Sequence, residues 1–176
     1  KSRGRLLVDF AGTSPAIRGP FNANRAIAVS AVFYVVRLLL DEDLPTNAGC
    51  LRPITVSIPP GSLLDPPRGS ACAMGNVETS QRLVDVLLQA FAVLAPGRMP
   101  AASQETMNNL SIGGRRPDGS AFTFYETIGG GAGAGPLGPG ASGIQVHMTN
   151  TMNTPVESLE SEFPVRVTSY HQRRGS

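Results

Sequence analysis

The sequence predicts an α+β fold in which a mixed sheet carries two main helices and Gly-rich loops. The element order is the main observation, because strand, helix, strand and helix are followed mostly by strands. A hydrophobic content of 41% suffices for a packed core and excludes disorder of the whole chain, while 20 Gly and 15 Pro promise many turns. The length of 176 residues predicts one domain, or one large piece of a domain, over residues 1–176.

The first half contains two short strands around a helix. Leu6–Phe10 is a short apolar run, and Ile54–Ile58 alternates apolar and polar residues, so we expect a buried and a half-buried strand. Apolar residues at helical spacing predict a helix over Arg25–Leu40, capped by Asn22 or Asn24. Its apolar surface extends nearly all the way round, which is typical of a helix buried on more than one side.

A second helix and four strands are expected after these elements. Asn76 is the predicted cap of the helix, which ends at Pro96-Gly97 and has one apolar face formed by Leu83, Val86, Leu87, Ala90, Phe91 and Leu94. The strands are predicted over Met107–Ile112 and Phe122–Ile128, joined as a hairpin, and over Ile144–Met148 and Val165–Thr168.

Charge and composition exclude several classes of protein. A net charge of +2 is too balanced for a dedicated nucleic-acid binder, and two Cys with two His are too few for a zinc or disulfide framework, so we predict no metal site here. The uncharged run Ala26–Val36 is about half of the ~20 residues that span a membrane, so no membrane association is expected. No signal peptide is visible and both ends look cut from a longer chain, so the cytoplasm is the expected compartment.

The glycine run at residues 129–135 suggests a phosphate-binding loop. Such loops open a helix or precede Lys-Ser/Thr, whereas this run leads into Pro136-Leu137-Gly138-Pro139. A nucleotide site is therefore not expected. The alternatives are a structural or mobile surface loop and a loop that backbone or substrate approaches closely.

Two carboxylates and one histidine are acid–base candidates. Glu126 shares a strand face with Phe124, and a carboxylate on an aromatic face needs a partner or a raised pKa. Glu78 falls in the first turn of the second helix, where the helix dipole alone would explain it. His147 lies in a predicted strand, where a structural hydrogen bond is the alternative to a catalytic role.

Amide and hydroxyl groups are dense in two places, at Asn108-Asn109 and in the run from Thr149 and Asn150 to Thr154. Such groups can hold a planar polar ligand, such as an imide or lactam, through paired donors and acceptors. They also form ordinary turns. Cys50 and Cys72 are expected to be apolar fillers, since a reactive thiol needs a base beside it.

Taken in order, the motifs of this chain resemble the hydantoinase B/oxoprolinase family. They are VDFAGTS at 8–14, RGP at 18–20, NAGCLRPI at 47–54, GNVETSQR at 75–82, TMNNL at 106–110, YETIGGG at 125–131, HMTNT at 147–151, NTPVE at 153–157 and LE at 159–160. Each motif alone is weak, but the ordered set covers nearly the whole chain and is specific. The resemblance is to a C-terminal-central portion of much longer family members.

The resemblance implies part of an ATP-dependent hydrolase that opens cyclic amides such as hydantoin, N-methylhydantoin or 5-oxoproline. ATP and a divalent metal are expected in the complete complex, with ATP held by a hydantoinase A-like ATPase subunit or domain, and no cofactor is expected on this fragment. Relatives that carboxylate ketones of the acetone or acetophenone type are the alternative. The sequence does not separate hydrolysis from carboxylation or name the ring substrate.

The resulting candidates combine the motifs with this chemistry. Glu126, His147 and Glu78 are the predicted acid–base groups. The predicted substrate pocket consists of Asn76, Asn108, Asn109, Thr149, Asn150 and the backbone of Gly129, Gly130 and Gly131. We expect the fragment alone to be inactive. The rival hypothesis is a non-catalytic scaffold module whose Gly-rich loop and Asn-rich turns bind the ATPase partner.

Overall fold

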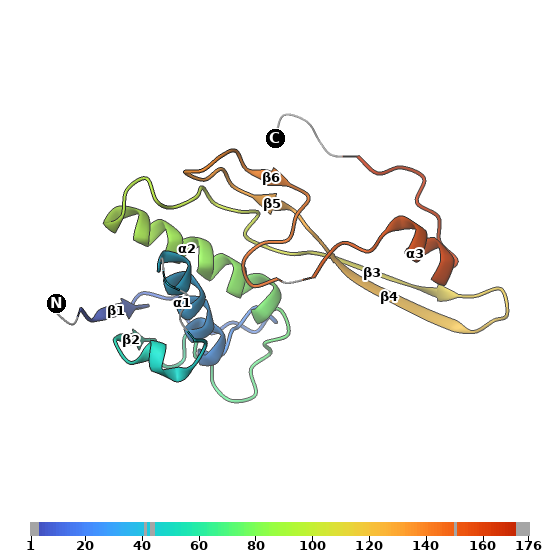
Figure 1. Cartoon of the computed structure of the whole chain (residues 1–176). Helices are drawn as coiled ribbons and strands as arrows, with labels where there is room; N and C mark the ends of the chain where they lie inside the picture. Colours follow the sequence, from blue (N-terminus) through green and yellow to red (C-terminus); the bar gives the residue numbers. More distant parts are fainter. Residues whose placement is uncertain (1–3, 41, 43–44, 150, 172–176) are drawn as a thin grey trace. The chain divides into compact units, whose positions relative to one another are not determined.

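The structure is a computed structural model that describes residues 4–40, 42, 45–149 and 151–171 (Figure 1). The chain divides into two compact units, residues 1–99 and 100–176. The described residues contain three α-helices and small two-stranded sheets, so the predicted α+β class is confirmed, although the strands do not join into one mixed sheet there. The single domain over residues 1–176 stays a prediction.

The first unit combines a parallel strand pair with two long helices. Strand β1 (Leu6–Asp9) pairs in parallel with β2 (Ile54–Ser57), and the register sets Leu6 opposite Ile54. Helix α1 (Arg25–Leu39) and the short 3₁₀ helix η1 (Ala48–Leu51) lie between these strands in the chain. The π-helix η2 (Gly75–Thr79) then leads directly into helix α2 (Ser80–Leu94).

Helix α1 begins as the sequence predicts, but in the described residues it is buried along one face and not on several sides. Asn24 is its cap, because the Asn24 side chain accepts a hydrogen bond from the backbone N–H of Ile27 at 3.0 Å. The helix packs against α2, and its buried side chains are small or β-branched: Ala28, Ala31, Val32 and Val35. Burial, together with the nearby Asp85 carboxylate, raises the pKa of the Tyr34 phenol on the same helix.

Asn22, the other predicted cap, instead joins the loop before α1 to the loop before η2. Its side chain is fully buried. The Oδ1 atom accepts the Ile17 N–H at 2.9 Å, and Nδ2 donates to the carbonyls of Ile17, Gly19 and Ala71 at 2.8, 3.0 and 2.9 Å. One amide thus satisfies four backbone groups of two irregular segments.

The start of the second helix differs from the prediction. Asn76 is not a cap, because it lies inside the π-helix, where its carbonyl accepts the Ser80 hydroxyl at 2.7 Å. Gly75 is buried against the backbone of Asn22 and Ala23, and a side chain at position 75 would overlap the Asn22 carbonyl. The Thr79 hydroxyl also donates to the Phe21 carbonyl. These contacts fix η2 on the segment that Asn22 organises.

The second unit is built on a long hairpin. Strands β3 (Asn108–Arg115) and β4 (Ala121–Ile128) pair antiparallel and confirm the predicted hairpin, extended by a few residues. Strands β5 (Gly131–Ala132) and β6 (Ala141–Ser142) form a second, very short ladder. The Gly-rich run at residues 129–135 therefore contains a short strand, β5, and is not an irregular loop throughout.

Helix α3 (Val156–Glu162) was not predicted, and the residue that follows it contacts the hairpin. The Phe163 ring, just after α3, lies 5.8 and 5.2 Å from the rings of Phe122 and Phe124. The Arg116 guanidinium stands 5.7 and 5.9 Å from the Phe122 and Phe163 ring centres, so it covers the same aromatic group.

Two predicted strands are absent. Residues 144–146 have no regular structure and residues 147–148 form a turn, in which His147 adopts the left-handed conformation with φ of 57°, which a strand cannot contain. Residues 165–168 have no assigned secondary structure and pair with no strand in the described part of the chain. Within the described residues, no helix is long and apolar enough to cross a membrane.

Replacing Asn22 should loosen the first unit. Asn22→Ala leaves buried backbone groups without their partner, at about 1–3 kcal/mol each. We therefore expect amide exchange over residues 15–24 and 70–79 to accelerate on the order of 100-fold or more, measured by hydrogen-exchange mass spectrometry. Asn76→Ala, at an exposed position, is the matched control and should change little. Equal exchange in both variants would contradict the role of Asn22.

Candidate functional site

Polar side chains gather around the end of hairpin β3–β4 in the second unit. We call Gln104, Asn108, Glu126, Gln145 and Asn153 the hairpin-end cluster. Asn108 and Gln145 donate to carbonyls of the last residues of β4, and Gln104 binds Asn108. Asn153 accepts the N–H of Gly129, just after β4, and Glu126 accepts the N–H of Thr154, just before α3. The cluster therefore ties the hairpin to the Gly-rich region and to residues 143–154.

Glu126 has the partner that its aromatic surroundings require. Its register partner is Leu110, and strand alternation sets it on the same face of the hairpin as Phe124, as predicted. The carboxylate accepts the backbone N–H of Thr154 through Oε1. A carboxylate has about four acceptor sites, so one N–H leaves capacity for a second donor. The residue is half-buried.

The two neighbouring asparagines take opposite faces of the hairpin. Asn108 belongs to the hairpin-end cluster: its Oδ1 accepts from Gln104 Nε2 at 2.6 Å, and its Nδ2 donates to the Ile128 carbonyl at 3.1 Å. Asn109 faces away, where its Oδ1 accepts the Tyr125 hydroxyl at 2.5 Å. The structure therefore does not bring Asn109 together with Asn108 and Glu126.

The structure leaves no room for a side chain at Gly129, Gly130 or Gly131. A side chain at Gly129 would meet the backbone of Ile144 and Gln145, and one at Gly130 would overlap the Gln104 side chain. Gly131 has φ of 128°, which glycine tolerates best. The Gly129 N–H donates to Asn153 Oδ1 at 2.9 Å. Other parts of the chain thus approach these glycines closely, and close approach of a substrate to them stays a prediction.

The segment after β6 carries His147 and Thr149. A hydrogen bond of 3.3 Å from the Thr149 N–H to the Val146 carbonyl closes a turn in which His147 is left-handed. Non-glycine residues in this conformation are strained and are often found at functional positions. The His147 side chain is half-buried, with Nε2 shielded from solvent. Asn150 lies outside the described residues.

Asn153 and Gln145 hold this segment in place. Asn153 Nδ2 donates to the Gly143 carbonyl at 3.3 Å, and Gln145 Nε2 donates to the Thr127 carbonyl. The hydroxyls of Thr127 and Thr151 are 3.2 Å apart. His147 and Thr149 are therefore carried by a segment attached at both sides to the end of β4.

The remaining candidates, Glu78 and Asn76, lie in the first unit. Both are in the π-helix η2, and the Glu78 N–H donates to the Met74 carbonyl at 2.9 Å. Glu78 is half-buried and Asn76 is exposed. Single-turn π-helices are rare and are frequently found at functional sites, so the conformation keeps both residues as candidates.

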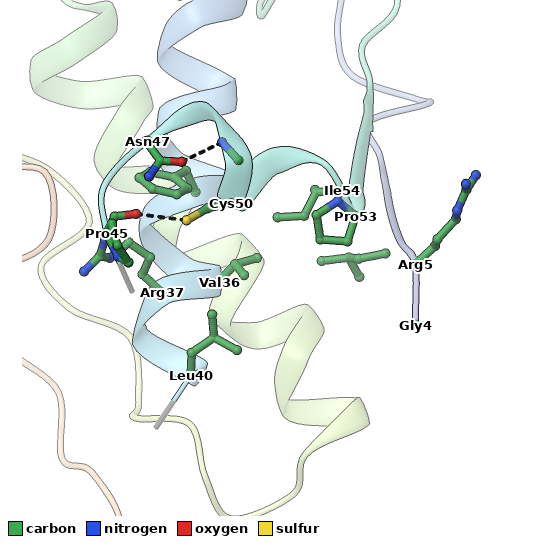
Figure 2. A pocket seen from close by; sticks show the side chains of 13 residues that line it. Gly4, Arg5, Val36, Arg37, Leu40, Pro45, Asn47, Cys50, Pro53 and Ile54 are labelled. Atoms are coloured by element: carbon green, nitrogen blue, oxygen red, sulfur yellow. Dashed lines mark hydrogen bonds between the residues drawn. The ribbon is translucent and has the colours of Figure 1, made fainter. Parts of the chain in front are cut away.

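The first unit also contains an apolar cavity of about 690 Å³ (Figure 2). It lies between α1, which contributes Phe33 and Val36 and is followed by Leu40, and the strand residues Leu6 and Ile54. The Cys50 thiol borders it and donates to the Pro45 carbonyl at 3.1 Å, which fits the expected filler role. The cavity lining includes none of the predicted site residues.

Ionisable groups give no metal-binding arrangement in the described residues, where no group of three or more His, Cys, Asp or Glu side chains could hold an ion. Hydrogen bonds from Ser120, with the nearby Arg116, lower the pKa of Asp118 in the turn of the β3–β4 hairpin. Asp118 is fully exposed there and stabilises the turn.

Sequence reasoning missed Gln104 and Gln145 as members of the hairpin-end cluster. Gln104 precedes β3, and its side chain and that of Asn108 donate hydrogen bonds to each other. The two residues are four apart in the sequence, a spacing that predicts contact only where the chain turns, and no turn was predicted between them. Gln145 is in the cluster because its segment lies against the end of β4, where its side chain binds the Thr127 carbonyl. No local sequence pattern predicts this contact.

The side chains of the hairpin-end cluster have the donor and acceptor chemistry that recognition of a planar amide needs. Amide side chains offer both donors and acceptors, and the Glu126 carboxylate offers acceptor sites beyond the one that the Thr154 N–H uses. Many of these groups are engaged with the backbone. They are therefore pre-ordered, as a recognition site requires.

Comparison with known proteins gives a consistent picture across both units. The family model described as hydantoinase B/oxoprolinase matches residues 1–176. The chain is 45% identical over 174 residues to 5-oxoprolinase 1 of Arabidopsis thaliana, covering 99% of this chain and 13% of that protein. It is 44% identical over 176 residues to 5-oxoprolinase of Dictyostelium discoideum, with 100% and 13% covered.

A solved structure shares the fold. The chain superposes on the crystal structure of the ATP-dependent caprolactamase from Pseudomonas jessenii with a TM-score of 0.63 and 19% sequence identity, covering 94% of this chain and 29% of that one. The chain thus spans 13% of the two oxoprolinases it matches and under a third of the caprolactamase chain.

Removing the Asn153 amide should release the segment that carries His147. Asn153→Ala deletes the donor to the exposed Gly143 carbonyl and the acceptor of the Gly129 N–H, which is shielded from water and costs about 1–3 kcal/mol when left unpaired. We expect amide exchange over residues 127–131 and 143–149 to accelerate at least about tenfold. Asn109→Ala, on the other face of the hairpin, is the matched control and should leave these peptides unchanged. Unchanged exchange in Asn153→Ala would show that the amide does not hold this segment.

Proposed function

Because the chain belongs to the hydantoinase B/oxoprolinase family, we propose that it is part of an ATP-dependent hydrolase that opens cyclic amides. The observation that carries the proposal is the identity of 45% with a 5-oxoprolinase, sustained over 99% of the chain. 5-Oxoproline is therefore the first substrate to test, with hydantoin and N-methylhydantoin next. The reaction adds one water across the ring C–N bond and yields a carboxylate and an amine or amide.

ATP and its divalent metal are assigned to another part of the complex. The described residues do not fit them, because the Gly-rich run leads into the short β5–β6 ladder and not into a helix N-terminus. The metal-ligating side chains described here also form no group of three. We therefore assign ATP to a hydantoinase A-like ATPase subunit or domain, and no step on this chain is derived from ATP. The cytoplasm stays the predicted location.

The hairpin-end cluster is the proposed contribution of this chain to the substrate pocket. A ring amide presents one N–H and one carbonyl, which side-chain amides can bind as a pair. Glu126 would then accept a proton from the attacking water, through the acceptor capacity that Thr154 leaves, and the proton would go on to the ring nitrogen as the C–N bond breaks. His147, carried by the neighbouring segment in a strained turn, is the second proton-transfer candidate.

Phosphate release from ATP by the complete protein with its ATPase partner tests this function. We expect release to depend on 5-oxoproline or a hydantoin and to be indifferent to bicarbonate. A ketone of the acetone or acetophenone type serves as the contrast substrate. Release that requires both the ketone and bicarbonate would reassign the protein to the carboxylases.

Two substitutions at Glu126 separate a chemical role from a structural one. Glu126→Gln keeps an oxygen that can accept the Thr154 N–H but removes the charge, whereas Glu126→Ala removes both. A proton-transfer role predicts that both variants lose turnover by about 10²–10⁴-fold, measured as ring opening in the complete complex. Glu157→Gln, on exposed helix α3, is the charge-matched control.

A purely structural Glu126 gives the opposite pattern. Glu126→Gln would then retain turnover and only Glu126→Ala would lose it. Combined with intact binding of the ATPase partner by every variant, that result would favour the rival hypothesis of a scaffold module.

A further inference from the structure

Helix α2 buries only part of its apolar surface in the described residues. Of the face predicted from the sequence, Leu83 and Leu87 are buried, whereas Val86 is 50% and Leu94 is 74% exposed. Ala90, between Val86 and Leu94 at a spacing of four residues, is exposed as well. Because residues four apart lie on one side of a helix, these three form a continuous apolar stripe. We call Val86, Ala90 and Leu94 the α2 stripe.

Strand β1 presents an open edge beside this helix. The Leu6 and Phe10 N–H groups donate to the Pro53 and Ser57 carbonyls of the β2 side, both at 2.9 Å. Backbone groups of successive residues point to alternate sides of a strand, so those of Leu7 and Asp9 face the other edge. In the described residues the sheet contains only β1 and β2, so no strand pairs with that edge (Figure 1).

The open edge and the α2 stripe border the same groove. A groove of about 230 Å³ is lined on one side by residues 6–10 and on the other by residues of α2 that include the whole stripe. A strand added next to β1 would therefore lie over the stripe. Parallel strands are normally found in sheets of more than two strands with both faces covered. In the described residues β1 and β2 form a sheet of two strands, and the exposed side chain of Leu7 shows that one face is open.

We propose that a further β-strand of the same polypeptide, from outside these 176 residues, pairs with the Leu7–Asp9 edge of β1 and packs on the α2 stripe. The length of the relatives identifies this occupant, because the chain spans 13% of the oxoprolinases and 29% of the caprolactamase chain. Most of such a polypeptide thus lies outside the stretch described here. The inference does not depend on which reaction the protein performs.

The groove also defines the chemistry of the added strand. Alternate side chains of a strand face one side, so every second residue of the added strand meets Val86, Ala90 and Leu94 and must be apolar. Leu7, whose side chain is 63% exposed, adds apolar surface at the same edge. Asp9 is exposed at the end of β1, and it disfavours an acidic residue opposite it.

Residue-resolved hydrogen exchange on the complete protein tests the pairing. The Leu7 and Asp9 amides should exchange about 100-fold or more slowly than unprotected amides, because the added strand accepts their hydrogen bonds. Val86→Asp should abolish this protection, whereas Gln89→Asp, which adds the same charge at another exposed position of α2, should preserve it. Leu7 and Asp9 amides that exchange like those of an unstructured peptide would overturn the proposal.

Photo-crosslinking identifies the occupant independently. With p-benzoylphenylalanine in place of Val86 in the complete protein, the crosslinked peptide should come from the same polypeptide outside these 176 residues. Mixing isotopically labelled and unlabelled protein distinguishes a crosslink within one chain from a crosslink between copies. A crosslink to a second copy, to a separate subunit or only to residues 1–176 would overturn the assignment.

Discussion

The structure depends on one constraint, namely that the backbone groups of its long irregular segments must find hydrogen bonds outside helices and sheets. Side-chain amides meet this constraint in both units. In the first unit Asn22 satisfies four backbone groups of two loops, and the π-helix at the start of α2 rests on the same segment. In the second unit Asn153, Gln145 and Glu126 bind the segment over residues 143–154 to the end of β4.

This constraint explains why the same residues are candidates for substrate binding and also hold the loops in place. Amides and carboxylates that order a loop are held in fixed positions, and fixed polar groups with acceptor capacity left over are what a small polar ligand needs. Glu126 shows both aspects, since one oxygen orders Thr154 and the residue stays half-buried at the border of the hairpin-end cluster. Asn109 is also a polar residue with fixed contacts, but it lies on the opposite face of the hairpin and is not part of the cluster.

The sequence predicted the elements whose signals are local. Helix α1 with its Asn24 cap, the two separate strands of the first unit and hairpin β3–β4 each follow from periodicity and turn residues within one segment, whereas the parallel pairing of β1 with β2 was not predicted. The failures concern segments whose conformation is set by distant contacts. Alternation suggested a strand over Ile144–Met148, but attachment of this segment to β4 imposes a turn at His147. The π-helix at Gly75 likewise depends on packing against Asn22, some fifty residues earlier in the chain.

The central claim is that the hairpin-end cluster forms part of a cyclic-amide pocket. A structure of the complete protein with 5-oxoproline bound, determined at a resolution that shows the ring, tests it most directly. The account predicts ring amide atoms within hydrogen-bond distance, about 3 Å, of side chains of this cluster, with Glu126 among them. A ring bound at a separate site, with the hairpin-end cluster covered by other parts of the protein, would contradict the claim and leave the cluster a structural role alone.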